Sequence, residues 1–429
     1  MSTRPYRPSR RALLKGAGAA AAAPTVLSAG VLGKLPPSER ITVGMIGVGM
    51  HGIGWNLQGL LRCQDARVVA VCDVMASRRE DAKQRVDEAY GDRSCTSHAD
   101  WREVIAREDI DAVMISTPDH WHVPMSMAAI RAGKDVCCEK PTLTIEQGRV
   151  LSDAVREHGT VFQTSTEDRS IPLYHRMAEL VRNGRIGKLQ RIRVTLPAGT
   201  VEPAPPDLAP VPEGFDYDMW LGPAPAAPYA RNRCGNQEWR NISDYSGGKF
   251  SDWGMHHVDT AQWANDSERT GPVEVEGAGE FPGEDSLFDT AIRYDLRYLY
   301  ANGVELLIES GGSSLRFEGS EGWVGNAGWR RPLEASSPGI LESQLGPEET
   351  RLFTCAGGEH RNFLDCVRSR EAPYFPAEVG HRCATLMHMG NIAMGLGRKL
   401  RWDPDAERFL EDDEANALRS RPLREPWTL

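Results

Sequence analysis

The sequence predicts an α/β protein of two domains, an N-terminal doubly wound parallel sheet and a C-terminal α+β domain with a mostly antiparallel sheet. Three observations lead to this fold class. Short apolar runs alternate with helical patterns up to about residue 163, a glycine-rich turn follows the first run, and the alternation is lost after residue 164. With 429 residues, the chain is long enough for two hydrophobic cores.

The first domain is expected to cover residues 39–163. Its predicted strands are apolar runs at 41–46, 67–73, 112–116, 135–138 and 161–162. Its predicted helices lie between the strands, at 52–62, 76–90, 122–132 and 145–158. Because a strand that returns through a helix pairs in parallel with its neighbour, the carboxyl ends of these strands should meet at one edge of the sheet, where such folds bind ligands.

The second domain is expected to cover residues 164–429 and to carry a substrate pocket on its sheet. Predicted helices lie at 173–183, 252–263, 359–368 and 378–396, and predicted strands at 190–195, 304–309 and 314–318. Five prolines between Pro203 and Pro212 predict an ordered loop or a lid. A sheet face left uncovered in this domain would suit a homo-oligomer.

The turn after the first strand has the spacing of a dinucleotide-binding site. It reads Gly47-x-Gly49-x-x-Gly52, with Met50 and His51 inside the turn. Glycines at these positions allow a tight turn, a close approach of the backbone to a pyrophosphate and the start of a helix, whose free N–H groups and dipole favour phosphate. These five residues are therefore candidate cofactor ligands.

Asp73 ends the second apolar run, about twenty residues after the glycine turn. A carboxylate there would accept hydrogen bonds from both ribose hydroxyls and would repel a 2′-phosphate, which favours NAD over NADP. The alternative is an aspartate that serves only the strand-to-turn connection.

Two further segments follow predicted strands and should reach the same edge of the sheet. Residues 116–122 contain polar and ring side chains, and the candidate cofactor contacts there are Thr117, Pro118, His120 and His122. Glu139 and Lys140 follow the next strand. A lysine at this edge could be partly desolvated, which would lower its pKa and allow it to share a proton with a substrate hydroxyl. The alternative is a surface lysine paired with Glu139.

A predicted helix of the second domain carries Asp252 and His256 four residues apart, hence on one face. A carboxylate beside an imidazole suits proton abstraction from an alcohol while a hydride leaves the same carbon. Zinc bound by His256, His257 and Asp259 is the competing interpretation, but a third ligand at a convincing spacing is missing and Lys140 would be a poor neighbour, so we predict no metal.

Together these motifs resemble the Gfo/Idh/MocA oxidoreductase family, from about residue 40 to the C-terminus, and residues 380–404 resemble its exported subgroup. The resemblance implies an NAD(P)-dependent enzyme for sugars, cyclitols and related polyols. It implies a catalytic set of Lys140, Asp252 and His256. More weakly, it implies substrate contacts from Tyr245, Trp253 and His257. Many relatives carry a segment that contains Gln or Arg after the last strand of the first domain, whereas residues 163–170 here include Glu167 and Asp168.

Residues 1–35 are a separate segment. Arg10-Arg11, a following leucine pair, Lys15 and an alanine run resemble a twin-arginine export signal, which carries folded proteins out of the cytoplasm. The apolar stretch is short for a membrane span, so no transmembrane domain is expected beyond the signal. We expect an exported protein, periplasmic or membrane-associated; a disordered basic tail is the alternative.

The composition bears on which ligands the protein could bind and on the state of its cysteines. A net charge of −10 argues against nucleic acid, which needs a basic face. Nine cysteines lack a CxxC pair, and several lie in apolar runs, so most are expected to be buried thiols. Tryptophans that could stack on a sugar face, or simply pack in loops or the core, are Trp220, Trp239, Trp323 and Trp329.

Export and cofactor together suggest a particular activity. Free NAD is scarce outside the cytoplasm, so we expect NAD that stays bound and is regenerated in place. The first hypothesis is an oxidoreductase acting on a hydroxyl of a sugar, polyol or glycoside, with Asp252 orienting His256 or the substrate. The alternative is a redox-neutral glycoside hydrolase or lyase, which needs an additional base such as Tyr245 or His257. A carbohydrate-binding protein without turnover is the third.

Overall fold

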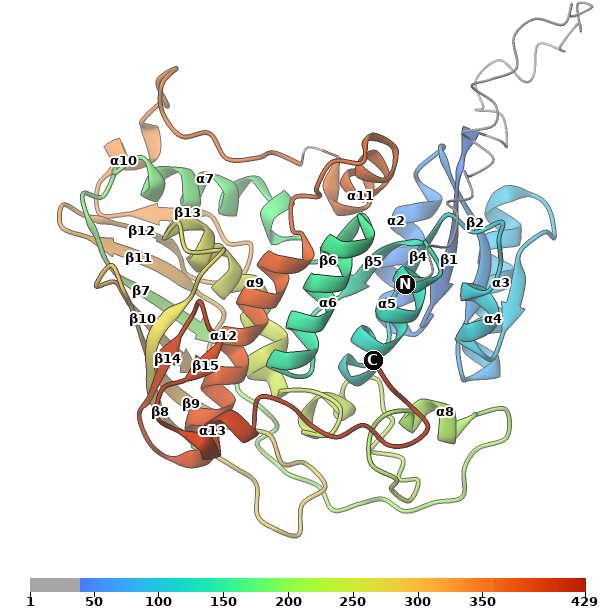
Figure 1. Ribbon diagram of the computed structural model, residues 1–429. Coiled ribbons are helices and arrows are strands. Elements are labelled where there is room, and N and C mark those ends of the chain that lie inside the picture. Colours follow the sequence, from blue (N-terminus) through green and yellow to red (C-terminus); the bar gives the residue numbers. More distant parts are fainter. Residues whose placement is uncertain (1–38, 356) are drawn as a thin grey trace, which may run out of the picture. The chain divides into compact units, whose positions relative to one another are not determined.

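The computed structural model describes residues 39–355 and 357–429 (Figure 1). The predicted export signal at residues 1–35 lies outside the described residues. Within the described part, no helix combines the length and the apolar character needed to cross a membrane.

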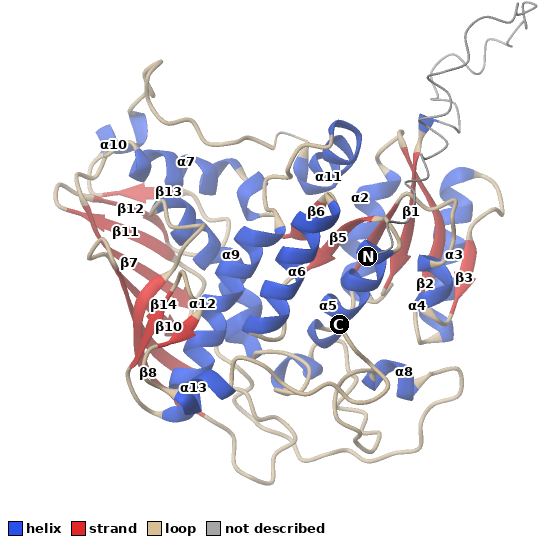
Figure 2. Cartoon of the chain, in the orientation of Figure 1, coloured by secondary structure: helices blue, strands red, loops and turns tan. Residues whose placement is uncertain are grey.

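The first domain contains the predicted parallel sheet, which has six strands in the order β3-β2-β1-β4-β5-β6 (Figure 2). Its strands are β1 (Ile41–Ile46), β2 (Ala66–Cys72), β3 (Thr96–His98), β4 (Ala112–Ile115), β5 (Asp135–Glu139) and β6 (Phe162–Ser165). β3 escaped prediction because its three residues are polar and lie at the sheet edge. β6 extends past the expected boundary after residue 163.

The helices of this domain follow the predicted alternation. They are the π-helical η2 (Gly52–Leu57) with α2 (Gln58–Leu61), α3 (Ala76–Tyr90), α4 (Trp101–Ile105), α5 (Asp119–Arg131) and α6 (Ile145–His158). α6 has the predicted bounds because Thr144 caps its first turn and Gly159 ends it in a left-handed conformation. α5 begins three residues before the predicted start, directly after Pro118, so His120 and His122 are helical.

The second domain is built on a nine-stranded sheet in the order β13-β12-β11-β7-β10-β9-β8-β14-β15. β7 and β10 pair in parallel and the other pairs are antiparallel, so the sheet is mixed but mostly antiparallel. Its strands are β7 (Leu189–Leu196), β8 (Pro272–Glu280), β9 (Arg293–Tyr300), β10 (Glu305–Ser310), β11 (Leu315–Gly319), β12 (Trp323–Asn326), β13 (Leu333–Ala335), β14 (Leu400–Asp403) and β15 (Arg408–Phe409).

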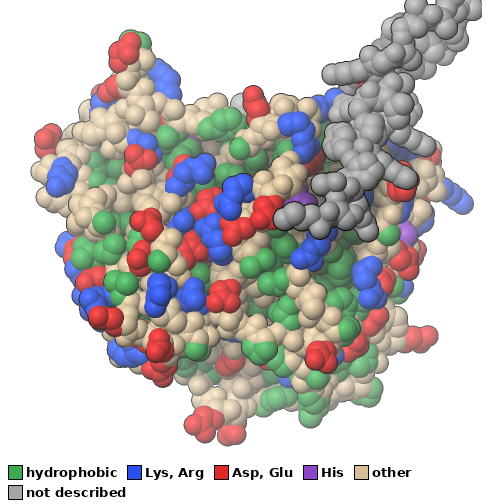
Figure 3. Space-filling view, in the orientation of Figure 1, with side chains coloured by type: hydrophobic (Ala, Val, Ile, Leu, Met, Phe, Trp, Pro, Cys, Tyr) green, Lys and Arg blue, Asp and Glu red, His purple; other side chains and the backbone are tan. Residues whose placement is uncertain are grey.

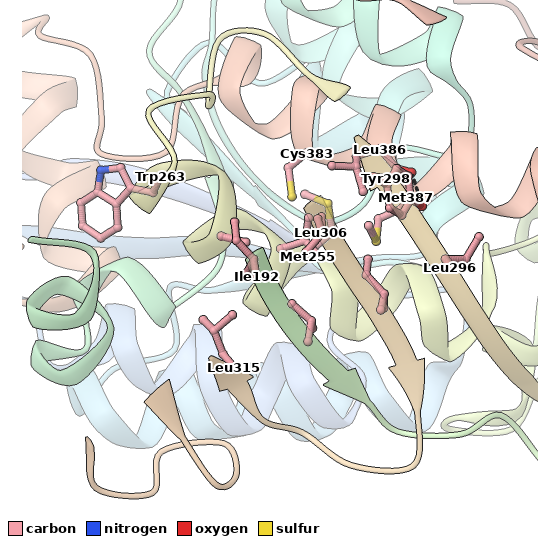
Figure 4. Packing of buried hydrophobic residues seen from close by; sticks show 14 of the residues in the cluster. Ile192, Met255, Trp263, Leu296, Tyr298, Leu306, Leu315, Cys383, Leu386 and Met387 are labelled. Atoms are coloured by element: carbon pink, nitrogen blue, oxygen red, sulfur yellow. Dashed lines mark hydrogen bonds between the residues drawn. The ribbon is translucent and has the colours of Figure 1, made fainter. Parts of the chain in front are cut away.

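Helices cover one face of this sheet. The helices that follow β6 are η3 (Asp168–Ser170), α7 (Pro172–Arg182), α8 (Tyr217–Leu221), η4 (Glu238–Asn241), α9 (Gly248–Ala264), α10 (Pro338–Glu342), α11 (Gly358–Ser369), α12 (Ala377–Leu396) and α13 (Asp413–Ala417). Figure 4 shows Ile192 and Leu306 on the strands beside Met255 of α9 and Met387 of α12. This core fixes α9, which carries the predicted catalytic pair, against the sheet.

Two late segments return to the first domain. Phe363 and Leu364 of α11 are fully buried in the same cluster as Val43 and Met45 of β1. Near the C-terminus, the ring of Trp427 packs edge-on at 4.7 Å from Trp121 of α5. The parallel-sheet domain is therefore completed by residues far along the chain.

The surface and the thiols agree with the composition. Figure 3 shows basic and acidic side chains interspersed on the visible face rather than gathered by sign. All nine cysteines are free, and all but Cys63 are buried.

Candidate active site

A cavity of about 380 Å³ lies where the carboxyl ends of the parallel strands face α9. The predicted site residues that line it are Gly47, Gly49, Met50, His51, Gly52, Asp73, Thr117, Pro118, His122, Glu139, Lys140, Asp252 and His256. The structure thus brings the expected cofactor and catalytic residues to one cavity, with the exception of His120.

In the glycine turn, backbone segments approach one another so closely that a side chain at Gly47 or Gly52 would collide with a carbonyl oxygen. Gly47 has φ +84°, and a Cβ there would lie 2.5 Å from the carbonyl oxygen of Ser116. A Cβ on Gly52 would lie 2.3 Å from the carbonyl oxygen of Gly47. The turn leads directly into a helical segment that begins at Met50 and runs through η2 and α2. The first backbone N–H groups of a helix have no partner within the helix, and such groups suit a pyrophosphate.

Asp73 holds this turn in place. Its Oδ2 accepts a hydrogen bond from the Val48 N–H at 3.0 Å, and its Oδ1 accepts one from the Met75 N–H at 2.9 Å. Burial raises the pKa of the Asp73 carboxyl. A carboxylate oxygen has room for a second donor, so these bonds leave it able to accept from ribose hydroxyls. Asp73 therefore has the structural role that was its alternative interpretation, and it still lines the cavity.

A nicotinamide dinucleotide fits the residues present. Thr117 lines the cavity, and its buried hydroxyl has no hydrogen-bond partner within the part of the chain that the structure describes. Such an orphaned hydroxyl, in the cavity that the glycine turn also lines, is what a bound ligand would satisfy. These residues and Asp73 would hold the cofactor.

The two predicted histidines of α5 have different positions. His120 is buried with its Nε2 3.0 Å from the Trp220 carbonyl oxygen, and it does not line the cavity. His120 lies in the first turn of α5, whereas the helix was predicted only from residue 122, so its burial could not be foreseen. His122 lines the cavity, with ring nitrogens 2.7 Å from the Pro141 carbonyl and 2.9 Å from the Thr117 carbonyl. His122 therefore links the segment after β4, at Thr117, to the segment after β5, at Pro141.

Lys140 pairs with Asp252 across the cavity. Its Nζ donates to Asp252 Oδ1 and to the Asp252 carbonyl, both at 2.7 Å. Burial lowers the pKa of Lys140, but the adjacent carboxylate outweighs burial and leaves that pKa above its usual value. The expectation of a lowered lysine pKa is therefore wrong, because it considered desolvation without this partner.

Glu139 does not pair with Lys140. It accepts from Asn56 Nδ2 at 2.8 Å and lies 3.0 Å from His51 Nε2. The carboxylate raises the pKa of His51 to about 9, so His51 is a cation at neutral pH. Burial would raise the pKa of Glu139, but His51, Asn56 and Lys140 together lower it to about 2.

His256 faces the segment after β6. Its Nδ1 lies 2.9 Å from Thr166 Oγ1 and 3.7 Å from Asp168 Oδ1. Burial, then the charge of Lys140, lowers the pKa of His256, so the imidazole is neutral near pH 7. Asp252 was expected to orient His256 or the substrate. It contacts Lys140 rather than His256, so only the second of these roles stays a prediction.

Several site residues were missed by the sequence analysis. Thr166 and Asp168 lie in the segment 163–170 that departs from the family pattern, and no role was predicted for either. Arg240 and Lys249 approach Asp252 Oδ2 at 3.2 and 4.0 Å. Neither belongs to a recognisable motif, so only the fold reveals them.

Some of the residues expected to contact the substrate line the cavity, and others do not. Trp253 lines the cavity, as do Trp220, Trp239 and Trp329, whereas Trp323 does not. Tyr245 and His257 are fully buried outside it: Arg233 Nη1 donates to the Tyr245 hydroxyl at 3.0 Å, and His257 Nε2 lies 2.9 Å from the Ser313 carbonyl. They therefore cannot supply the additional base expected for a redox-neutral reaction.

The competing zinc site is also not formed. Asp259 is held by Arg169 through two hydrogen bonds of 2.7 Å. Across residues 39–355 and 357–429, no three His, Cys, Asp or Glu side chains gather as metal ligands would.

A glycine cradle for a dinucleotide, facing a lysine–aspartate pair and a neutral histidine, defines a two-domain nucleotide-dependent oxidoreductase. Residues 41–166 match the family model for the NAD-binding Rossmann fold of an oxidoreductase family, and residues 204–429 match its C-terminal alpha/beta domain. The chain belongs to the Gfo/Idh/MocA oxidoreductase family.

Curated relatives act on carbohydrates by name. A 1,5-anhydro-D-fructose reductase from Ensifer adhaerens is 34% identical over 152 residues, 35% of this chain and 44% of the relative. A levoglucosan dehydrogenase from Pseudarthrobacter phenanthrenivorans is 30% identical over 161 residues, 37% and 41% of the two chains. A glycosyl hydrolase family 109 protein from Shewanella is 36% identical over 118 residues, 26% and 25% of the two chains. The matches thus span less than half of these relatives.

Solved structures share the fold. The WlbA dehydrogenase from Bordetella pertussis, in complex with NADH and UDP-GlcNAcA, superimposes with a TM-score of 0.62 at 17% identity, covering 85% of this chain and 99% of the other. An aldose-aldose oxidoreductase from Caulobacter crescentus, complexed with glycerol, superimposes with a TM-score of 0.62 at 17% identity, covering 84% of this chain and 99% of the other.

Proposed function

We propose that the protein is an NAD-dependent oxidoreductase that oxidises or reduces a hydroxyl-bearing carbon of a sugar, polyol or glycoside. The observation that carries this proposal is the pair of proton-handling groups on one cavity. Lys140 has a raised pKa and His256 a lowered one, so one is a cation and the other a neutral base at the same pH. Groups whose pKa values are pushed apart in this way take different roles in acid–base chemistry.

In the oxidation direction, His256 accepts the proton of the substrate hydroxyl. Thr166 and Asp168 hold its Nδ1 side, which leaves Nε2 for the substrate. The Lys140 ammonium stabilises the negative charge that develops on the hydroxyl oxygen, and Asp252 holds Lys140 in place. Bound NAD would supply the hydride acceptor. The reduction runs through the same contacts in reverse.

The relatives' names support a carbohydrate substrate, and Asp73 at the end of β2 supports NAD over NADP. We further propose that NAD stays bound between turnovers. The loop at residues 234–240 lines the cavity, and Arg78 Nη2 on α3 donates to Asn236 Oδ1 at 3.0 Å, which ties this loop to the cofactor domain. Retained NAD suits the exported, periplasmic or membrane-associated location proposed from residues 1–35.

A redox-neutral glycoside hydrolase or lyase is the second candidate, favoured by the match to the glycosyl hydrolase family 109 relative. With Tyr245 and His257 outside the cavity, the additional base would be Glu167, which lines it 3.9 Å from His256. Release of nitrophenol from a nitrophenyl glycoside without added NAD would favour this candidate.

The first test is the cofactor content of the purified, dialysed protein, measured by acid release and by the near-ultraviolet band of NADH before and after sugars are added. NAD that survives dialysis and is reduced by one class of sugar supports the proposal. Protein that is empty after dialysis and turns over only with added NAD would refute retention. Failure of every sugar to reduce bound or added NAD would refute the oxidoreductase itself. Light scattering of the same sample tests a homo-oligomer, which we propose forms through the uncovered sheet face.

A further inference from the structure

Three cationic side chains surround a single carboxylate at the substrate end of the cavity. Lys140 Nζ lies 2.7 Å from Asp252 Oδ1. On the other oxygen, Arg240 Nε lies 3.2 Å and Lys249 Nζ 4.0 Å from Asp252 Oδ2. All four side chains line the cavity and are at least three-quarters buried. One negative charge therefore serves three positive ones.

Other acidic groups around the cavity are already engaged. Glu139 is matched by His51 at 3.0 Å, and Glu167 by Arg330 at 3.0 Å. Asp119 accepts from Ser246 Oγ at 2.6 Å, and burial raises its pKa to about 7, which reduces its charge at neutral pH.

The surplus positive charge is therefore concentrated on Arg240 and Lys249. The Arg240 guanidinium lies over the Trp239 ring at 4.3 Å, and its Nη1 is 3.3 Å from Gln237 Oε1. Gln237 Oε1 also lies 3.5 Å from Lys249 Nζ. These are weak, neutral contacts for two cations that are largely removed from solvent. A buried charge is costly unless an opposite charge accompanies it.

We propose that the substrate is a carbohydrate that carries a carboxylate, a uronic or aldonic acid, and that Arg240 and Lys249 bind this carboxylate. The inference rests on the proposed function, because it assigns the substrate class of the same site. The reacting hydroxyl then lies at Lys140 and His256. Lys140 and Arg240 contact different oxygens of Asp252, so the two subsites are separated by little more than a carboxylate and its two ion pairs. A single sugar ring spans this separation.

A neutral sugar would satisfy this site less well. Hydroxyl groups can accept hydrogen bonds from Arg240 and Lys249, but they leave the charge surplus unchanged. A carboxylate restores balance, and the planar guanidinium can bind its two oxygens with two parallel hydrogen bonds. Discrimination between the two ligand types follows from the charge that is left unpaired in one complex and paired in the other.

The experiment compares sugars that differ only in this group. The full-length protein with its bound NAD is mixed with D-glucuronate, D-galacturonate, the matched neutral sugars, the methyl ester of D-glucuronate and glucose 6-phosphate. Reduction of the bound NAD is followed in a single turnover, and its second-order rate constant is taken as kcat/KM. We expect kcat/KM for a uronate to exceed that for its neutral sugar and its ester by roughly tenfold to a hundredfold, as for loss of a charge-assisted hydrogen bond. This comparison needs no variant.

Variants then test the two residues. Arg240→Gln and Lys249→Met should each lower kcat/KM for the uronate at least about tenfold while changing that for the neutral sugar much less. Arg240→Lys, which retains the charge, should recover part of the loss. Lys399→Met removes a surface lysine that pairs with Glu274 and should leave both values unchanged. NAD content and the thermal transition verify that each variant is folded.

The outcomes separate this inference from the proposed function. Reduction of bound NAD by neutral sugars at rates equal to or above those of uronates would overturn the carboxylate subsite and leave the oxidoreductase intact. A preference for glucose 6-phosphate over both uronates would overturn it as well. If none of the sugars reduces NAD, the proposed function fails first, and the substrate class fails with it.

Discussion

Replacing Asp252 with asparagine removes a negative charge that Lys140, Arg240 and Lys249 share, while it keeps the size of the side chain. At the 2.7 Å separation of Lys140 Nζ and Asp252 Oδ1, two unit charges attract by about 6 kcal/mol at an effective dielectric constant of about 20. Breaking such a buried pair costs about 3–5 kcal/mol of folding free energy. We expect a loss near 3 kcal/mol, because asparagine still accepts a hydrogen bond.

The same substitution should change the pH profile. In the wild type, burial lowers the pKa of Lys140 and Asp252 raises it above the usual value. Asp252→Asn removes the largest raising influence, so burial and Arg240, which lower the pKa, are opposed only by the weaker attraction of Glu139. Activity that requires the Lys140 ammonium is lost as pH rises through this pKa. The alkaline limb of kcat/KM should therefore move to lower pH, and turnover near pH 7 should fall roughly a hundredfold.

The assay is kcat/KM for the best sugar across a pH series, together with urea denaturation. Asp365→Asn is the control, because Asp365 is 61% exposed and pairs with Arg361 on one helix face, a contact that contributes only about 0.3–0.5 kcal/mol. An alkaline limb at the wild-type position in Asp252→Asn would refute the assignment of Lys140 and Asp252 as a functional pair.

Four further predictions concern the catalytic residues His256 and Lys140, the pH dependence set by His256, the glycine-turn residue Asp73 and the buried ion pair of Arg169. His256→Gln and Lys140→Ala should each lower turnover roughly a hundredfold or more without unfolding the protein, and wild-type rates in both would sink the catalytic assignment. Because neutral His256 is the base and burial lowers its pKa, the wild-type oxidation rate should fall only below pH 6.5, as the imidazole becomes protonated; a midpoint above 6.5 would contradict this. Asp73→Ala should weaken NAD retention because it removes the acceptor that holds the glycine turn, and unchanged NAD content after dialysis would exclude that role. Arg169→Met leaves the buried Asp259 carboxylate unpaired and should lower the free energy of unfolding by about 3–5 kcal/mol, whereas Arg169→Met with Asp259→Leu should recover part of it, as urea titration would reveal; equal losses in both would argue against a paired charge.

Many residues of the site could be predicted from local sequence patterns. Gly47, Gly52 and Asp73 could be found because a phosphate turn imposes its spacing on neighbouring residues of one strand and one helix. Lys140 could be placed because strand ends converge at one edge of a parallel sheet. Asp252 and His256 share a helix face through their four-residue separation. Each of these relations lies within one or two consecutive elements, where the sequence pattern and the geometry coincide.

Partners that meet only after folding could not be assigned. Asp252 and His256 were expected to act together because they are neighbours on a helix, yet Asp252 contacts Lys140 from β5 and His256 contacts Thr166 after β6. Arg240 lies twelve residues before Asp252, in the short η4, which carries no motif. The direction of the Lys140 pKa shift was wrong for the same reason, since it depends on a charge from the other domain.

The return of α11 and of the C-terminal residues to the first domain has a consequence for protein engineering. A chimera that takes residues 39–165 from one relative and the remainder from another would combine a β1 face shaped for one α11 with an α11 from elsewhere, because Phe363 and Leu364 are buried against Val43 and Met45. The contact of Trp427 with Trp121 adds the same constraint at the other end. The cofactor domain of this chain would therefore have to be exchanged as three separate stretches of sequence.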